Sequence, residues 1–374
     1  MQSTTGISGG PSEASREPRR LEVGFFAVFL LLMCVIAAIA TRGYLNTVEA
    51  NGDNHSYARV TDAVLSHNLM SVRAVKQFWG LSYCAALLCA ALRTNAYQAI
   101  GMISFLSTVI SLILVTDLWS GWIAVYFVAT NYVLLQFGAF GGADCVFLLL
   151  VLISLRFARR NQWAACSLTG ALSATIRPLG VILLAGVCVH LRRHFKVLSL
   201  VLGIAAAIFL LYLAPLALYL RNPLLNWSGY QQQDWSGQAP IGWPLAALIE
   251  NVRNGANVGN PAMVILKIGY IGLHLAALCG LCVNPKRRQR LFMHGEEGIT
   301  VVLYSVFVLT YNAPTWAFSI YPRLLMPITP MLMNVYADIL PRNRVLPAVL
   351  GMVSVALAIG ANLGWSGLHI LLHR

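Results

Sequence analysis

Charged residues are scarce in this sequence. Only 10% of its 374 residues are Asp, Glu, Lys or Arg, whereas 58% are hydrophobic, and the mean hydropathy is +0.70. A soluble domain carries about 25% charged residues, so this composition excludes an ordinary soluble fold. The apolar runs are continuous rather than alternating, which excludes a transmembrane barrel and predicts an all-α polytopic membrane protein.

The sequence also lacks a polar, basic domain with interleaved aromatic residues, although its formal net charge is +13. Lys and Arg fall mostly in short clusters between apolar runs, where positive charge sets membrane topology. We therefore expect the lipid bilayer as a partner and no nucleic acid. The eight cysteines lie mostly inside apolar runs and form neither a disulfide framework nor a metal-ligand pattern.

No internal repeat or separate soluble domain is evident. We expect one transmembrane domain over residues 21–365, between a disordered cytoplasmic tail at 1–20 and a short tail at 366–374. Three arginines precede the first apolar run, Val23–Thr41, which indicates a signal anchor with its N-terminus in the cytoplasm. The protein is expected in the bacterial inner membrane rather than the ER membrane, because its loops are short.

Further apolar runs predict roughly nine to eleven transmembrane helices, some short or broken. A first outer loop is expected to carry short interfacial helices. The further runs are Phe78–Leu92, Ala96–Thr116, Trp119–Phe137, Cys145–Phe157, Trp163–Leu191, Val197–Leu220, Pro261–Val283, Ile299–Asn312, Leu324–Leu340 and Val345–Leu363.

Basic clusters test the topology. They are Arg156–Arg160, Arg192–Lys196, Lys286–Arg290 and Arg342–Arg344. If Phe78–Leu92 does not cross the membrane, and Trp163–Leu191 breaks at Arg177-Pro178, all four clusters lie on the cytoplasmic side. We prefer this arrangement, which places the loops with the most polar side chains outside.

Acidic residues number only thirteen, so those near the membrane are informative. Asp53, Asp144 and Asp234 come from three different outer segments. Asp53 follows the first apolar run, and Asp144 ends a glycine-rich stretch and begins a helix. The Asp53 carboxylate either takes a proton from an acceptor hydroxyl or caps a short helix at the membrane surface. Asp144 either caps the helix that it begins or, with the glycines before it, belongs to a turn that allows close backbone contact with a ligand.

Cations and aromatic residues supply further candidates. Arg177 lies inside an apolar stretch and must find an acid, a carbonyl or a phosphate. Lys76 and Arg323 lie at the outer interface, where they either anchor a lipid phosphate or snorkel. The Trp- and Gln-rich segment Asn226–Pro240 either binds a sugar or belongs to the aromatic belt. Two sites, beginning at Asn54 and Asn226, match the N-glycosylation pattern.

The order of these motifs resembles a known family. An outer-loop Asp is followed by Gly-Gly-Ala-Asp before a helix, by Ala174-x-x-Arg177-Pro178-x-Gly180, by Gln232-Gln233-Asp234-Trp235, and by Tyr321-Pro322-Arg323. Together they resemble the integral-membrane glycosyltransferases of the GT-C class, and within it the GPI mannosyltransferase 2-like family. The resemblance covers most of residues 21–365. Two features depart from it: the first-loop motif is Gly-Asp-Asn-His rather than a pair of acids, and Gly-Gly-Ala replaces an aromatic residue before Asp144.

The resemblance implies a hexosyltransferase. It would move a hexose, with mannose expected, from a polyprenyl-phosphate donor to a lipid- or protein-linked acceptor at the non-cytoplasmic face, with inversion. Asp53 and Asp144 would be the catalytic acids, with Asp53 as the base or the acceptor-positioning group. The substrate-binding residues would be His55, Tyr57, Lys76, Arg177, Gln232, Asp234, Trp235, Tyr321 and Arg323.

No cofactor is required by the motifs. Carboxylates next to a phosphate are compatible with a divalent cation such as Mg²⁺ or Mn²⁺, but no residue is assigned as a metal ligand. Two other functions stay open: a transporter or flippase, which would predict repeats and paired broken helices, and a non-catalytic subunit of a glycan-assembly complex, which would tolerate loss of Asp53.

Overall fold

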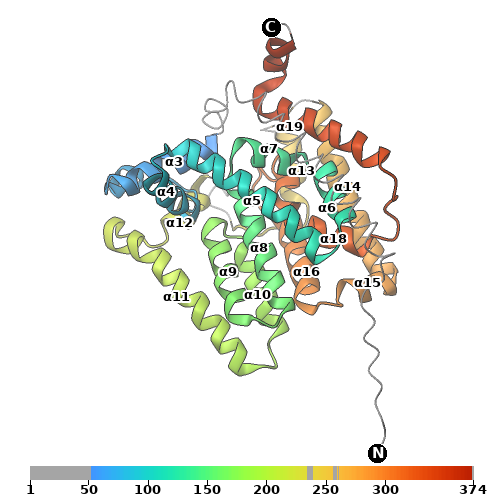
Figure 1. Cartoon of the computed structure of the whole chain (residues 1–374), viewed down its shortest axis with the longest axis horizontal. Coiled ribbons are helices and arrows are strands. Elements are labelled where there is room, and N and C mark those ends of the chain that lie inside the picture. The colour runs from blue at the N-terminus through green and yellow to red at the C-terminus, as the bar shows by residue number, and fades with distance from the viewer. Residues whose placement is uncertain (1–51, 234–238, 256–258, 260, 373–374) are drawn as a thin grey trace, which may run out of the picture.

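The computed structural model of the chain describes residues 52–233, 239–255, 259 and 261–372 (Figure 1). Within these residues there are 17 α-helices and one short 3-10 helix, and the extended backbone pairing is an isolated antiparallel bridge between Ile241 and Tyr311. The predicted all-α fold class is confirmed. The predicted anchor Val23–Thr41 lies outside the described residues.

The helices follow the predicted runs closely. In chain order they are α3 (Gly52–Leu65), η3 (Leu69–Val72), α4 (Gly80–Leu92), α5 (Ala96–Leu118), α6 (Gly121–Thr130), α7 (Tyr132–Phe140), α8 (Ala143–Arg159), α9 (Trp163–Ile176), α10 (Gly180–His190), α11 (Phe195–Leu220), α12 (Leu225–Gln233), α13 (Ala246–Asn254), α14 (Pro261–Val283), α15 (Pro285–Leu291), α16 (Gly295–Thr310), α17 (Tyr321–Leu325), α18 (Thr329–Val335) and α19 (Val345–Leu372). The last of these continues into residues that were predicted as a short tail.

Few of the described helices are long enough to span a membrane alone. Three of them, α5, α11 and α14, have the length and hydropathy for it, and two bent pairs raise the number to five if each pair is one span: α6 with α7, bent by 82°, and α15 with α16, bent by 107°. The prediction of nine to eleven spans also counts shorter apolar helices, among them α4, α9 and α10. The segment predicted as the first outer loop contains the helices α3 and η3; its side of the membrane stays a prediction.

Proline explains two of the breaks. Pro178 separates α9 from α10, because its ring cannot continue a helix that has already formed. The predicted single run Leu324–Leu340 is instead two short helices, α17 and α18, and each has a proline in its first turn. Proline is favoured at that position because the N–H groups of the first helical turn have no partner within the helix. The predicted run Leu324–Leu340 therefore forms two short helices rather than one long helix.

The basic clusters gather at one end of the bundle. Arg159, the last residue of α8, pairs with Glu297 in the first turn of α16 and donates to the carbonyl of Leu118, the last residue of α5. His190, the last residue of α10, lies 3.9 Å from Glu296. These contacts bring the ends of α5, α8 and α10 together with the start of α16.

Two more contacts place the remaining clusters at that end. Arg290 in α15 donates to Asp338 over 2.6 Å, and Tyr126 in α6 donates to the carbonyl of Pro341 over 2.5 Å. Because α6 and α15 flank the ends just described, all four basic clusters share one end of the molecule. That this end faces the cytoplasm stays a prediction.

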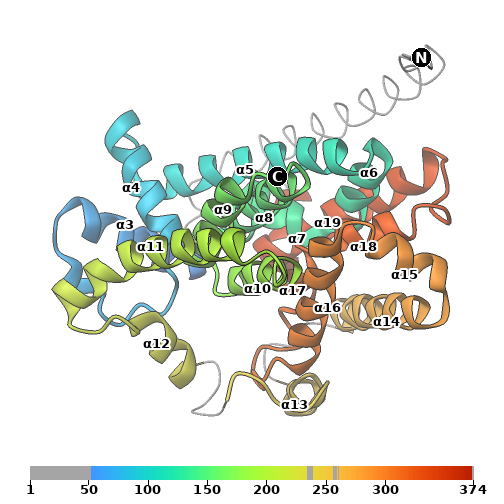
Figure 2. The same ribbon diagram turned by 90° about the horizontal axis from the view of Figure 1, so that it is seen from below.

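The opposite end holds the starts of α3, α5, α8 and α17. Figure 2 shows α3, α4 and α12 at one side of the bundle, with α14 and α15 at the other. The largest apolar core cluster reaches this end through Tyr57, Phe147, Phe318 and Tyr321, all of which are buried. The core therefore supports the polar groups described below.

Close packing of α9 on α10 gives a testable prediction. A Cβ added at Gly180 would overlap the backbone nitrogen of Ala174 and the hydroxyl of Ser173. We expect Gly180→Ala to destabilise the protein by about 1–3 kcal/mol, because overpacking of a tight contact forces the backbone to move. Thermal unfolding of the detergent-solubilised protein measures this.

The matched control is Gly203→Ala in α11, where an added Cβ meets no atom within 4 Å. This variant should unfold at the wild-type temperature or slightly above, because alanine favours helix over glycine. Equal unfolding temperatures for the two variants would contradict the α9–α10 contact.

Candidate active site

One arginine joins two carboxylates at the end opposite the basic clusters. The Arg323 guanidinium donates from Nη2 to Asp53 Oδ2 and from Nε to Asp144 Oδ2, each over 2.7 Å. Arg177 donates from Nη2 to the same Asp144 oxygen over 2.8 Å. Four residues that are far apart in the sequence therefore form one cluster, called here the aspartate–arginine cluster.

Asp53 is placed by its neighbour in the first turn of α3. The Asn54 amide donates to the carbonyls of Phe140 and Gly141, over 3.0 and 3.2 Å, and its side chain is buried. These bonds hold α3 against the turn between α7 and α8. Gln77 donates to Asp53 Oδ1 over 3.3 Å. A buried, bonded Asn54 is also no substrate for the glycosylation that the sequence pattern allowed.

Asp144 is placed by the two glycines before it. Gly141 has φ +82°, a backbone conformation that residues other than glycine adopt only with strain. A Cβ on Gly142 would overlap the Phe137 ring. Helix α8 therefore begins directly after a tight turn, with Gly142 at its N-cap. Asp144 lies in the first turn, where the helix dipole favours a carboxylate, and caps no helix.

Arg177 is positioned by the proline that follows it. A residue before proline is driven toward extended backbone, and Arg177 has φ −141° and ψ 134°. This conformation ends α9 and leaves the side chain at the break between α9 and α10. Sequence alone left an ion pair and a phosphate site open for Arg177; its ion pair with Asp144 is observed, and the same side chain lines a cavity.

Arg323 is carried by the short helix α17, which a buried hydrogen-bond chain fixes. The hydroxyl of Tyr321 lies 2.7 Å from His274 Nδ1 in α14, and His274 Nε2 lies 3.0 Å from the Ser305 hydroxyl in α16. The guanidinium of Arg323 also lies over the Phe137 ring, 4.5 Å from its centroid, which is a favourable cation–π geometry. Arg323 is therefore contacted directly by side chains of α3, α7 and α8. The helix that carries it is held by α14 and α16.

Charge pairing dominates the electrostatics of Asp53. Its burial opposes ionisation, but the positive charges of Arg323 and Arg177 outweigh this effect and lower the pKa of Asp53 from 3.8 to about 2. A lowered pKa means that this carboxylate stabilises the fold above the pKa of an unfolded aspartate. That contribution is lost as the pH falls toward 2. At neutral pH Asp53 is an ionised partner of two arginines.

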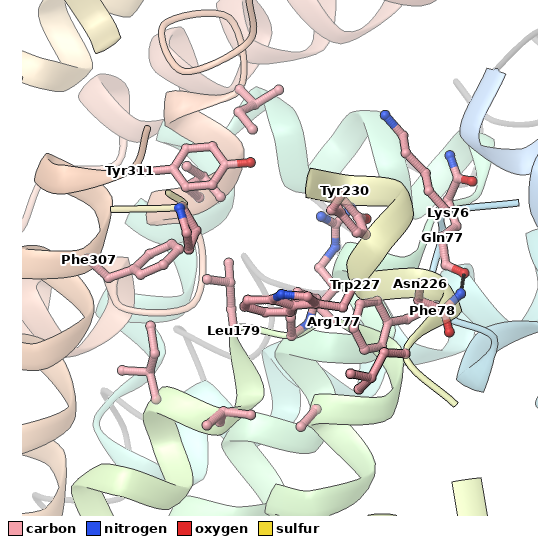
Figure 3. Close-up of a pocket in the computed structure, with 18 of the residues that line it drawn as sticks. Lys76, Gln77, Phe78, Arg177, Leu179, Asn226, Trp227, Tyr230, Phe307 and Tyr311 are labelled. Carbon is pink, nitrogen blue, oxygen red and sulfur yellow. Dashed lines mark hydrogen bonds between the residues drawn. The ribbon is translucent and has the colours of Figure 1, made fainter. Parts of the chain in front are cut away.

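A cavity of about 520 Å³ opens beside the cluster. Its polar end is lined by Asp53, Lys76, Gln77, Arg177 and Arg323, whereas Asp144 is not among the lining residues. In Figure 3 Lys76 and Gln77 lie on one side, Phe307 and Tyr311 on the other, and Trp227 and Tyr230 between them. The volume lies within the range of about 300–1,000 Å³ that is typical of ligand pockets.

The rest of the cavity lining is mostly apolar. It includes Val181, Ile182, Phe209, Leu213, Phe307 and Ile320, which come from α10, α11, α16 and the segment before α17. Only 17% of the most apolar 18-residue stretch of α11 is buried inside the protein. The apolar part of the lining therefore includes a helix that a bilayer would cover.

Helix α12 closes the polar end. Asn226 donates to the carbonyl of Gln77 over 2.7 Å and accepts from the Tyr212 hydroxyl over 2.9 Å, and a Cβ on Gly229 would lie 2.7 Å from that of Lys76. Lys76 lies over the Tyr230 ring, 5.6 Å from its centroid. Gln77 was not singled out from the sequence. Asn226 and Tyr230 were named only as part of the segment Asn226–Pro240, for which sugar binding and the aromatic belt both stayed open.

The other predicted site residues have different environments. Tyr57 is buried one turn along α3 from Asp53, and Tyr321 belongs to the buried hydrogen-bond chain. His55 and Gln232 are exposed on α3 and α12, and His55 Nδ1 lies 2.9 Å from the Tyr97 hydroxyl. The structure therefore does not bring these two into the cavity. Asp234 and Trp235 lie outside the described residues.

The residues at this site do not form a metal-binding group of their own. In the described part of the chain no three His, Cys, Asp or Glu side chains lie close enough to hold an ion. Both cluster carboxylates are already paired with arginine. Whether a divalent cation enters together with a phosphate stays a prediction.

No protein-family model and no curated protein matches the chain. The structure is similar to the crystal structure of ArnT from Cupriavidus metallidurans bound to undecaprenyl phosphate, with a TM-score of 0.54 and 12% sequence identity. The match covers 91% of this chain and 64% of ArnT, so the chain spans less than two thirds of that protein.

At this level of identity the similarity shows the fold. The bundle described above shares the fold of ArnT, which confirms the predicted GT-C-like, all-α architecture. The described helices that are long and apolar enough to cross a membrane agree with a multi-pass membrane protein.

Proposed function

We propose that this protein is a GT-C glycosyltransferase that moves a hexose from a polyprenyl-phosphate donor to an acceptor hydroxyl. One observation carries the proposal: the aspartate–arginine cluster supplies Asp53, Arg177 and Arg323 to a cavity whose remaining lining is mostly apolar. A donor with a phosphate and a long hydrocarbon chain needs both charged and apolar lining residues. The GT-C fold and the bound undecaprenyl phosphate of ArnT support the same assignment.

Three cations would hold the phosphate of the donor. Lys76, Arg177 and Arg323 line the polar end, and guanidinium groups bind phosphate oxygens through paired N–H donors. The prenyl chain would extend along Phe209 and Leu213 toward the bilayer. The sugar would then lie near Asp53, because Asp53 lines the same polar end.

Charge favours a donor with one phosphate. The three cations and the two carboxylates, Asp53 and Asp144, leave one net positive charge at the polar end. A polyprenyl-phosphate sugar is a phosphodiester with one negative charge and neutralises it. A diphosphate donor would leave an unpaired negative charge in a partly buried site, which is costly.

The reaction is a single displacement. The acceptor hydroxyl attacks the anomeric carbon, its proton goes to Asp53, and the bond between the anomeric carbon and the phosphate oxygen breaks. The electron pair of that bond leaves with the polyprenyl phosphate, whose growing charge the arginines stabilise. Attack opposite the leaving group inverts the anomeric configuration. Asp144, buried beneath both arginines, would act by positioning them.

The finer assignments rest on the sequence. Mannose as the hexose follows from the resemblance to the GPI mannosyltransferase 2-like family, and transfer at the non-cytoplasmic face follows from the basic clusters at the opposite end. A bacterial inner-membrane location with a cytoplasmic N-terminus belongs to the same proposal. Incubation of the purified protein with polyprenyl-phosphate mannose or glucose, followed by detection of donor turnover, tests the function directly.

Loss of the Asp53 charge should remove activity. Asp53→Asn is nearly isosteric but accepts a proton poorly, so we expect transfer to fall by about 10²–10⁴-fold. Turnover of the lipid-linked sugar in proteoliposomes supplied with a membrane extract as acceptor source measures this.

The control is Asp62→Asn, the same substitution on the exposed side of the same helix α3. It should retain wild-type turnover. Full turnover by Asp53→Asn would remove Asp53 from the mechanism and favour the non-catalytic alternative.

Donor affinity should depend on Lys76. Lys76→Met keeps the length and apolar stem of the side chain but removes the charge at the polar end of the cavity, so we expect KM for the donor to rise by about 10-fold with a smaller change in kcat. Arg73→Met, on the exposed part of the same loop, is the control. Similar donor KM values for the two variants would indicate that Lys76 does not touch the donor.

A further inference from the structure

The Arg323 side chain binds two aspartates and also lines the cavity. It holds Asp53 and Asp144 through Nη2 and Nε, and it also lines the cavity in which the donor phosphate would bind. A guanidinium carries five N–H donors, and the two carboxylate bonds use two of them. A phosphate in the cavity and the carboxylate of Asp53 therefore share one cation.

Asp53 is poorly suited to proton transfer while it is paired with Arg323. With its pKa lowered to about 2 by its arginine partners, despite burial, Asp53 has little affinity for the proton of an acceptor hydroxyl. General bases work best when their pKa lies closer to the working pH. Something must weaken the hold of Arg323 on Asp53 before the reaction.

The donor phosphate supplies that change. Its negative charge at Arg323 and Arg177 offsets the positive charge that Asp53 experiences, and the phosphate oxygens compete for the guanidinium N–H groups. We propose that donor binding, by engaging Arg323, converts Asp53 from an ion-pair partner into the general base. The inference rests on the proposed function and adds an order to it, with the donor bound before the acceptor reacts.

The two aspartates differ in a way that fits this exchange. The side chain of Asp144 is 3% exposed, and it keeps Arg177 as a partner if Arg323 turns toward the cavity. The side chain of Asp53 is 31% exposed and lines the cavity. The buried carboxylate therefore stays neutralised while the accessible one is released. Once released, Asp53 takes the hydroxyl proton as the bond between the sugar and the phosphate breaks.

Proton uptake on ligand binding tests the exchange. The full chain in detergent is titrated with farnesyl phosphate at pH 4, by calorimetry in two buffers of different ionisation enthalpy. At this pH the phosphate monoester carries about one negative charge, like the donor diester, and its own titration near pH 6 contributes little. If Asp53 returns to an ordinary aspartate pKa, the wild type takes up roughly 0.4 proton more than Asp53→Asn.

The outcomes separate the two proposals. Binding with equal proton uptake by the wild type and Asp53→Asn would overturn the exchange and leave the donor site standing. No binding by the wild type would overturn the donor site itself. Infrared difference spectra of the wild type provide a second measurement that needs no variant: a carboxylic-acid band should appear on binding at pH 4, and its absence would also overturn the exchange.

Discussion

A guanidinium shared between two carboxylates is the constraint on which the end of this protein opposite the basic clusters depends. Removing charges from water costs several kcal/mol per ion unless each one is paired in good geometry. Arg323 meets this condition for Asp53, and together with Arg177 it meets it for Asp144. Removal of one partner from such a buried pair typically costs about 3–5 kcal/mol. The helices that carry these residues are therefore coupled to one another through charge as well as through apolar packing.

The same constraint accounts for the irregular backbone at this end. A membrane tolerates broken helices only where the freed backbone groups are buried in protein or line a polar cavity. The break at Pro178 places Arg177 at the cavity, the tight turn at Gly141 starts the helix of Asp144, and the short helix α17 carries Arg323. Each irregularity supplies one charged group to the cluster.

Much of this arrangement could be predicted from sequence, and the reasons differ by residue. Asp53, Asp144, Arg177 and Arg323 stood out because ionisable groups are rare and costly in an apolar chain. Their mutual contacts could not be derived, because single-sequence reasoning fixes which side of the membrane a residue faces and not which neighbours it meets. His55 and Gln232 were named from motif position, but side chains near Asp53 and Asp234 in sequence can point away from the cavity. Gln77 gave no signal and Tyr230 gave one only as part of the segment Asn226–Pro240, since their positions at the cavity depend on how α12 packs against the loop of Lys76.

The different roles proposed for Asp53 and Asp144 follow from their positions rather than from their residue type. Both are carboxylates in the first turn of a helix, and both accept a 2.7 Å bond from Arg323. Asp144 begins a helix that packs tightly against α5 and α9, so its carboxylate has no path to the cavity and serves as a fixed counter-ion. Asp53 begins an amphipathic helix at the rim, where a ligand can compete for its partner. A second carboxylate at the rim would lie closer to a bound phosphate and would repel it more strongly than Asp144 does from its buried position.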